Sequence, residues 1–111
     1  MAALIEVRTY RTRPGKRDEL LRLLAERGLP AHRDLGMKVL GPFPSLEDAT
    51  TFVWLRAFPD EASRQPMKDA FYHGEPWLSE LEATMMPLID EHSAVAVEDS
   101  IGLWDNWPTA T

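Results

Sequence analysis

Strand-like and helix-like segments follow one another along this chain in the order β-α-β-β-α-β, which few single-domain folds accommodate. Strand character, seen as alternating side chains or a β-branched and aromatic composition, occurs in four segments: residues 3–12, 37–43, 50–58 and 92–99. The order predicts an α+β fold of the split βαβ type. In it, a four-stranded antiparallel sheet carries its helices on one face.

The first helical region follows an Arg-Pro-Gly turn. Leucines recur at helical spacing over residues 16–28, and we expect Gly28 to cap this helix at its C-terminus. Pro30 is then expected to begin a second short helix that ends at Gly36.

The second helical region begins at Pro59, and Pro66 is expected to break or kink it before Gly74 ends it. Pro76 should begin the next helix. An apolar stripe of residues about one turn apart predicts that this helix packs into the core: Trp77, Leu81, Met85 and Leu88.

A length of 111 residues suits one domain, and we expect it to cover residues 1–100, followed by an irregular tail over residues 101–111. A net charge of −6 argues against nucleic-acid partners and anionic membranes. The chain has no cysteine, which excludes disulfides and thiolate metal sites. With neither an 18-residue apolar run nor a signal-peptide pattern, the expected location is the cytoplasm.

Alternation along the first and third strands brings polar and aromatic residues to one face of the sheet: Glu6, Arg8, Tyr10, Trp54 and Arg56. We expect the helices to cover the other face. A large exposed aromatic face usually marks an interface or a ligand groove, so two copies are predicted to pack these faces together as a homodimer that closes a barrel.

The segment IEVRTYRTRPGKRDELLRLL combines a strand of the type E-x-R-x-Y, a Pro-Gly turn and a leucine-rich helix. It is followed in order by KVLGPF, TTFVWLRAFPDEASR, EPW and MMPLIDEHSAVAVE. Over about residues 4–98 this series resembles the NIPSNAP family. The resemblance implies a ferredoxin-like protomer, a dimeric α+β barrel and a poorly defined activity. Related barrel families include cofactor-independent monooxygenases, polyketide cyclases and haem-degrading enzymes.

The third strand departs from the family pattern, which often has histidine, tryptophan and tyrosine at alternate positions. Here Trp54, Arg56 and Phe58 stand at those places. This departure argues against histidine- or phenol-based chemistry on the strand itself.

Two arginines are candidates for binding an anionic ligand. Arg8 and Arg56 could be brought together by neighbouring strands, and guanidinium groups bind carboxylate-like oxygens bidentately. The alternative is that Glu6, or an acid from a partner, neutralises them. Tyr10 and Trp54 could form the walls of a pocket for a flat molecule, or simply pack in the dimer core.

His73 and Tyr72, in the stretch FYHGEPW, are the candidate catalytic pair for proton transfer, with a plain helix end as the alternative. His32 is expected on a solvated helix face. His92 follows two acidic residues, but the three histidines have no metal-site spacing. No metal, haem or other cofactor is therefore predicted. Trp104 and Trp107 in the tail are expected to pack on their own domain, on a partner subunit or over the barrel.

These features favour a cofactor-independent enzyme of the oxygenase, cyclase, isomerase or lyase type, acting on an aromatic or carbonyl compound. The alternatives are a metabolite-binding or protein-interaction module without catalysis, and a structural dimer whose inner face is fully packed.

Overall fold

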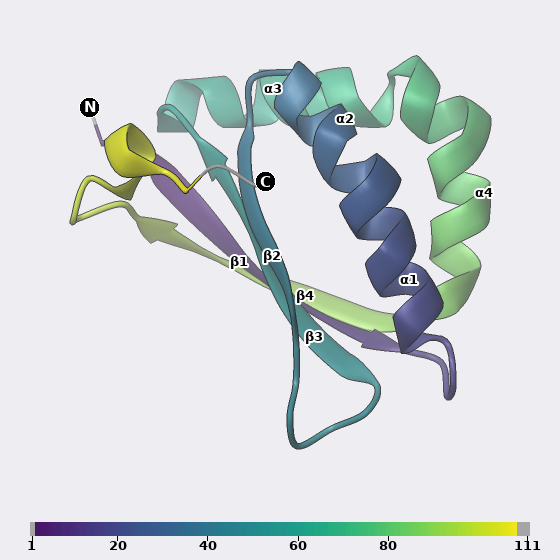
Figure 1. The fold of residues 1–111 in the computed structure, drawn as a ribbon. Coiled ribbons are helices and arrows are strands. Elements are labelled where there is room, and N and C mark those ends of the chain that lie inside the picture. Colours follow the sequence, from purple (N-terminus) through teal and green to yellow (C-terminus); the bar gives the residue numbers. More distant parts are fainter. Residues whose placement is uncertain (1, 109–111) are drawn as a thin grey trace.

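The computed structural model describes residues 2–108, and a four-stranded antiparallel sheet with the strand order β2-β3-β1-β4 forms its centre. The helices that precede β4 in the chain all lie on one face of this sheet (Figure 1). The predicted βαββαβ protomer is therefore confirmed. The strand bounds are β1 Leu4–Thr12, β2 Lys38–Pro44, β3 Thr51–Phe58 and β4 Ile89–Glu98.

The first helical region is one continuous helix rather than two. Its parts are α1 (Arg17–Leu23), a π-helical turn η1 (Leu24–Gly28) and α2 (Leu29–Asp34). The prediction that Gly28 ends a helix was wrong, because its φ of −67° is helical. A Cβ atom there would lie 2.9 Å from Leu24 Cδ1, so this glycine serves close packing. Gly36, with φ +87°, follows the helix end as expected.

The second helical region contains α3 (Glu61–Tyr72), which runs through Pro66 without interruption. Of the predicted break or kink, the break does not occur. Pro66 removes the hydrogen bond to the Ala62 carbonyl, and water can replace that bond because Ala62 is an exposed residue. After Gly74 the chain turns into three short helices: η2 (Trp77–Leu81, π-helical), α4 (Glu82–Met85) and η3 (Met86–Leu88).

The core lies between the sheet and the helices. It contains residues from the sheet and from both helical regions, including the predicted stripe: Leu20, Leu24, Leu29, Phe52, Phe58, Phe71, Leu81, Met85 and Leu88, with Trp77 packed against it.

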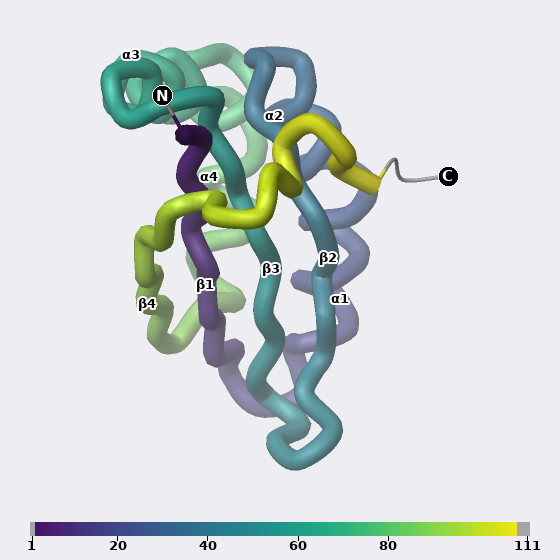
Figure 2. Tube along the Cα trace, turned by 90° about the vertical axis from the view of Figure 1, so that its left-hand side faces the viewer, coloured from purple at the N-terminus to yellow at the C-terminus, as the bar shows by residue number. Residues whose placement is uncertain are grey.

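The chain beyond β4 crosses the outer face of the sheet towards β2, as Figure 2 shows. The Asp99 carboxylate accepts hydrogen bonds from the backbone N–H groups of Leu103 and Trp104 and fixes the short helix η4 (Leu103–Asn106). The Trp107 indole N–H donates to the Val39 carbonyl at 2.8 Å. The tail tryptophans therefore pack on their own domain, one of the three predicted placements.

The polar and aromatic residues of β1 and β3 lie under the helices, opposite to the prediction. Glu6 and Arg56 are 1% and 0% exposed, respectively. The outer face carries aliphatic residues instead, and Val95 and Val97 on β4 are exposed. Alternation shows which residues share a face, but it does not show which face the helices cover.

Candidate functional site

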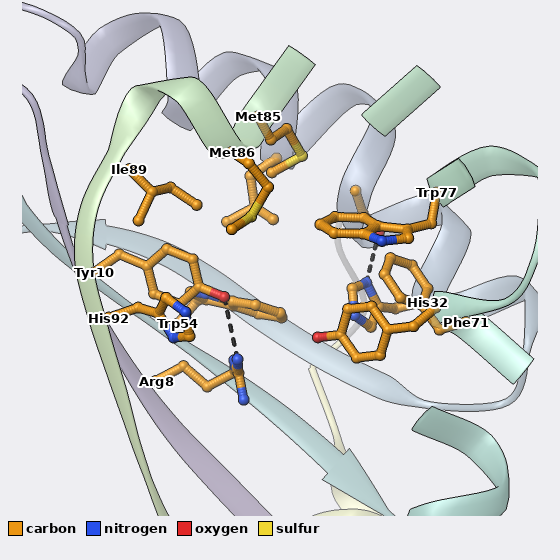
Figure 3. A pocket seen from close by; sticks show the side chains of 13 residues that line it. Arg8, Tyr10, His32, Trp54, Phe71, Trp77, Met85, Met86, Ile89 and His92 are labelled. Carbon is orange, nitrogen blue, oxygen red and sulfur yellow. Dashed lines mark hydrogen bonds between the residues drawn. The ribbon is translucent and has the colours of Figure 1, made fainter. Parts of the chain in front are cut away.

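A cavity of about 210 Å³ lies between the sheet and the helical layer (Figure 3). Residues from β1, β3 and β4 form its floor, and residues from all helical segments except α1 and η4 form its walls. The lining residues are Arg8, Tyr10, Leu24, Gly28, His32, Trp54, Phe71, Tyr72, Trp77, Met85, Met86, Ile89 and His92. Met86 and His92 are the exposed members of this set and mark its mouth.

Most of the lining is aromatic or aliphatic, and its rings contact one another. Tyr10 packs edge-on against Trp54, with ring centroids 5.9 Å apart, and Tyr72 packs edge-on against Trp77 at 5.2 Å. Rigid aromatic walls of this kind suit a flat, mainly apolar molecule.

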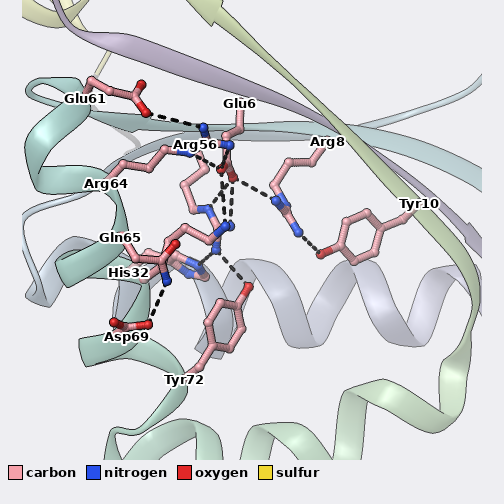
Figure 4. A network of polar contacts seen from close by, with 11 residues as sticks. Glu6, Arg8, Tyr10, His32, Arg56, Glu61, Arg64, Gln65, Asp69 and Tyr72 are labelled. Carbon is pink, nitrogen blue, oxygen red and sulfur yellow. Dashed lines mark hydrogen bonds and ion pairs between the residues drawn. The ribbon is translucent and has the colours of Figure 1, made fainter.

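Two guanidinium–phenol pairs supply much of the polarity of the cavity (Figure 4). Arg8 Nη2 donates to the Tyr10 hydroxyl at 3.2 Å, and Arg56 Nη1 donates to the Tyr72 hydroxyl at 2.9 Å. Because arginine only donates, each phenol accepts in its pair and keeps its own O–H for another acceptor. Within residues 2–108, neither phenol donates to a protein group.

Behind this end of the cavity, one buried carboxylate binds three arginines. Glu6 Oε1 accepts from Arg8 Nη1 at 2.8 Å and from Arg56 Nε at 2.9 Å, while Arg64 Nε donates to Glu6 Oε2 at 3.0 Å. Lys68 Nζ lies 3.8 Å from the same Oε2. We call these five residues the Glu6 cluster. It carries four positive charges against one negative charge, and it meets the cavity at Arg8, so this end of the cavity is cationic.

The arginines determine the charge of Glu6. Burial alone would raise the pKa of this carboxyl, but Arg56, Arg8 and Arg64 together lower its pKa to about 2. Glu6 is therefore ionised at neutral pH and acts as the acceptor that orients the guanidinium groups.

His32 is buried against the cavity, and both of its ring nitrogens are engaged. Nδ1 lies 2.7 Å from the Gly28 carbonyl, to which it must donate, so Nε2 is the acceptor from Arg56 Nη1 at 3.2 Å. The ring stacks on Phe71 with centroids 3.9 Å apart. Burial, with the positive charges of Arg56 and Arg8, lowers its pKa to about 3. His32 is therefore a neutral structural group.

The structure brings together four of the predicted site residues on the cavity surface: Arg8, Tyr10, Trp54 and Tyr72. Glu6 and Arg56 lie directly behind them, and Glu6 forms an ion pair with each of the two arginines, as the alternative expected. His73, the other predicted catalytic residue, is exposed at the end of α3 and does not line the cavity. A catalytic role for His73 or Tyr72 stays a prediction.

Sequence reasoning placed His32 in solvent, and this was wrong. A helix that continues through Gly28 puts His32 on the same stripe as Leu20, Leu24 and Gly28, at a constant spacing of four residues. The prediction that the helix ends at Gly28 left His32 out of this four-residue spacing, so its burial was missed. His92 also lines the cavity, because the register of β1 and β4 pairs it with Tyr10.

Two further properties concern residues 2–108 only. No three His, Asp or Glu side chains among them gather closely enough to hold a metal ion. Within the same range, no helix has both the length and the apolar character needed to cross a bilayer.

The sequence model of the NIPSNAP family matches residues 5–98. Among solved structures, a NIPSNAP family protein of unknown function from Agrobacterium tumefaciens has 23% identity and a TM-score of 0.76, with 87% of each chain covered. A second from the same organism has 19% identity and a TM-score of 0.78, covering 91% of this chain and 89% of that one.

A proposed antibiotic biosynthesis monooxygenase from Nitrosomonas europaea is similar at 14% identity and a TM-score of 0.72, covering 91% of this chain and 93% of its own. At such identities these structures show a shared fold. No curated protein matches this sequence.

Proposed function

The chain belongs to the NIPSNAP family, whose activity is unknown, and from this premise we propose that it is an enzyme without a cofactor that acts on a small aromatic or carbonyl compound. The substrate binds in the cavity beneath the helices. The observation that carries this proposal is the excess of hydrogen-bond donors at one end of an otherwise apolar cavity.

That excess specifies what the ligand must offer. The Tyr10 and Tyr72 hydroxyls keep free protons, and the Arg8 Nε–H and the Trp54 indole N–H are buried without an acceptor among the described residues. The cavity lining contains no carboxylate. A carbonyl, carboxylate, phenolate or enolate oxygen would satisfy these donors, and the net positive charge of the Glu6 cluster favours an anion.

The size of the cavity limits the ligand further. An apolar cavity of about 150 Å³ holds one benzene molecule, so one of about 210 Å³ suits a single ring with a small substituent. Formation of an oxyanion next to a ring or carbonyl group is a step that oxygenases, cyclases, isomerases and lyases can share. Donors placed at the developing negative charge accelerate this step. The fold shared with a proposed monooxygenase is consistent with this class.

A thermal-shift screen tests the proposal. The panel contains single-ring carboxylates, phenols, quinones and aryl keto acids, each paired with a neutral analogue that lacks the acceptor oxygen. We expect the anionic members to raise the Tm by mass action. Tyr10→Phe keeps the ring and removes the donor, so it should weaken binding by about tenfold. Equal stabilisation by the neutral analogues would contradict the assignment.

A binding module without catalysis is the second candidate, and one observation favours it. The cavity lining supplies no carboxylate base, and the acceptor nitrogen of His32 is already occupied by Arg56. A ligand that binds tightly in the screen and is recovered unchanged under all conditions would support this candidate.

The partner that we propose is a second copy of this chain, paired through the outer face of the sheet. Val95 is 62% exposed and Val97 is 42% exposed, and Val7, Val53 and Leu55 beside them are half-buried. Such an aliphatic face suits sheet-on-sheet packing. Light scattering should give twice the monomer mass, and Val95→Lys should reduce it to that of the monomer.

For the cellular location, we propose the cytoplasm, because its reducing conditions are compatible with a chain that contains no cysteine.

A further inference from the structure

Enolate formation needs a base as well as an oxyanion site, and two histidines line the cavity. His32 does not fit this task, because its Nδ1–H is donated to Gly28 and its Nε2 lone pair is occupied by Arg56. His32 also has no exposed edge from which a proton could pass to water, since it is 3% exposed.

His92 has the opposite surroundings. It lies on β4 directly across from Tyr10 in the antiparallel register, with ring centroids 5.3 Å apart. Figure 3 shows its ring beside that of Tyr10. It is exposed at the mouth of the cavity, and among the described residues it makes no hydrogen bond that would occupy its ring nitrogens.

The charged groups near His92 do not occupy its ring nitrogens. Asp90 and Glu91 precede it on β4, and both carboxylates bind the guanidinium of Arg11, at 3.0 Å and 2.5 Å. The hydroxyl of Tyr10 accepts from Arg8. The imidazole is therefore available both to a ligand in the cavity and to solvent.

We propose that His92 is the catalytic base for abstraction of a proton from carbon next to a carbonyl group, in substrates of the aryl keto acid class. This inference rests on the proposed function. The C–H bond breaks, its electron pair moves to the carbonyl oxygen as an enolate, and the proton forms an N–H bond on the imidazole. Arg8 and Tyr10 bind the enolate oxygen. The step needs no oxidant. The imidazolium exchanges its proton with water at the mouth and returns a proton from the solvent to the enolate carbon, which restores the keto form.

Phenylpyruvate is a suitable probe, because it combines one ring, a carboxylate and an acidic CH₂ group next to a ketone. Its CH₂ protons exchange with deuterium in D₂O when the enolate forms, and NMR follows this exchange. We expect wild-type protein to accelerate the exchange, and His92→Gln to reduce that acceleration by about 100-fold or more. Binding of phenylpyruvate should change less than about threefold, since the contacts of Arg8 and Tyr10 remain.

Glu98→Gln is the matched control, because Glu98 is also an exposed residue of β4 but lies outside the cavity lining. The Glu98→Gln variant should catalyse deuterium exchange into phenylpyruvate at the wild-type rate. Full exchange activity in His92→Gln would overturn the inference and leave the proposed function intact. Failure of phenylpyruvate to bind or exchange, while benzoates or phenols do bind, would overturn the substrate class. Failure of every anionic compound to bind would overturn the proposed function itself.

Discussion

Replacement of Glu6 by glutamine tests how the Glu6 cluster is stabilised. The substitution keeps the shape of the side chain and removes its charge, so that four cations remain around a neutral group. Arg56, at 0% exposed, has no solvent to compensate for this loss. Removing one partner of a buried ion pair typically costs about 3–5 kcal/mol.

The pKa of Glu6 gives a separate magnitude. Its lowering from 4.5 to about 2 corresponds to about 3 kcal/mol in favour of the ionised form in the folded protein. Because the folded pKa lies below the unfolded value, this stabilisation is fully present above about pH 4.5. It is lost as the pH falls towards about 2.

Urea unfolding of both proteins measures the effect. At pH 7 we expect Glu6→Gln to lower the free energy of unfolding by about 3 kcal/mol, and at pH 3 the difference should shrink to about 1 kcal/mol. Glu61→Gln is the matched control, since this exposed acid lies 3.9 Å from Arg64 and should matter by less than about 1 kcal/mol. A difference below about 1 kcal/mol at pH 7, or one that does not vary with pH, would refute the reasoning.

Four further predictions concern His32 at the cavity, Asp99 at the start of the tail and Gly36 after α2. His32 should remain neutral with its proton on Nδ1 down to about pH 4, because its pKa is lowered to about 3; ¹⁵N NMR shifts that report protonation near pH 6.5 would contradict this. An unfolded histidine takes up a proton below about pH 6.5, whereas the pKa of His32 in the folded protein is about 3. The His32→Gln variant should therefore lose less stability than the wild type as the pH falls from about 6.5 to about 3, as urea unfolding would show. Asp99→Ala removes the acceptor of two backbone N–H groups and should cost about 1–2 kcal/mol, measured as a lower Tm. Gly36→Ala forces a side chain into φ +87° and should cost about 1 kcal/mol in urea unfolding; an unchanged midpoint would show that the backbone relaxes there.

The glycines and prolines show where local sequence rules predict the backbone correctly and where they do not. Gly36 has the positive φ expected after a helix. The register shift between Leu40 and Phe43 coincides with Gly41 and Pro42, two residue types that are typical of bulges. Gly28 and Pro66 follow the same local rules in the sequence but lie inside helices. At Gly28, close packing against Leu24, one turn earlier in the same helix, outweighs the local preference, and the four-residue spacing of Leu20, Leu24, Gly28 and His32 contains that information.

The sequence by itself determined the order of the elements, the strand alternation and the grouping of Glu6, Arg8, Tyr10, Trp54 and Arg56 on one face, because these follow from periodicities of about 2 and 3.6 residues. Only the tertiary structure decided which face the helices cover, since alternation is symmetric between the two sides of a sheet. The helices cover the polar face because Glu6 neutralises part of the charge of the buried arginines, and those partners meet only when strands and α3 are assembled. The positions of His32 and His92 at the cavity follow from the same assembly.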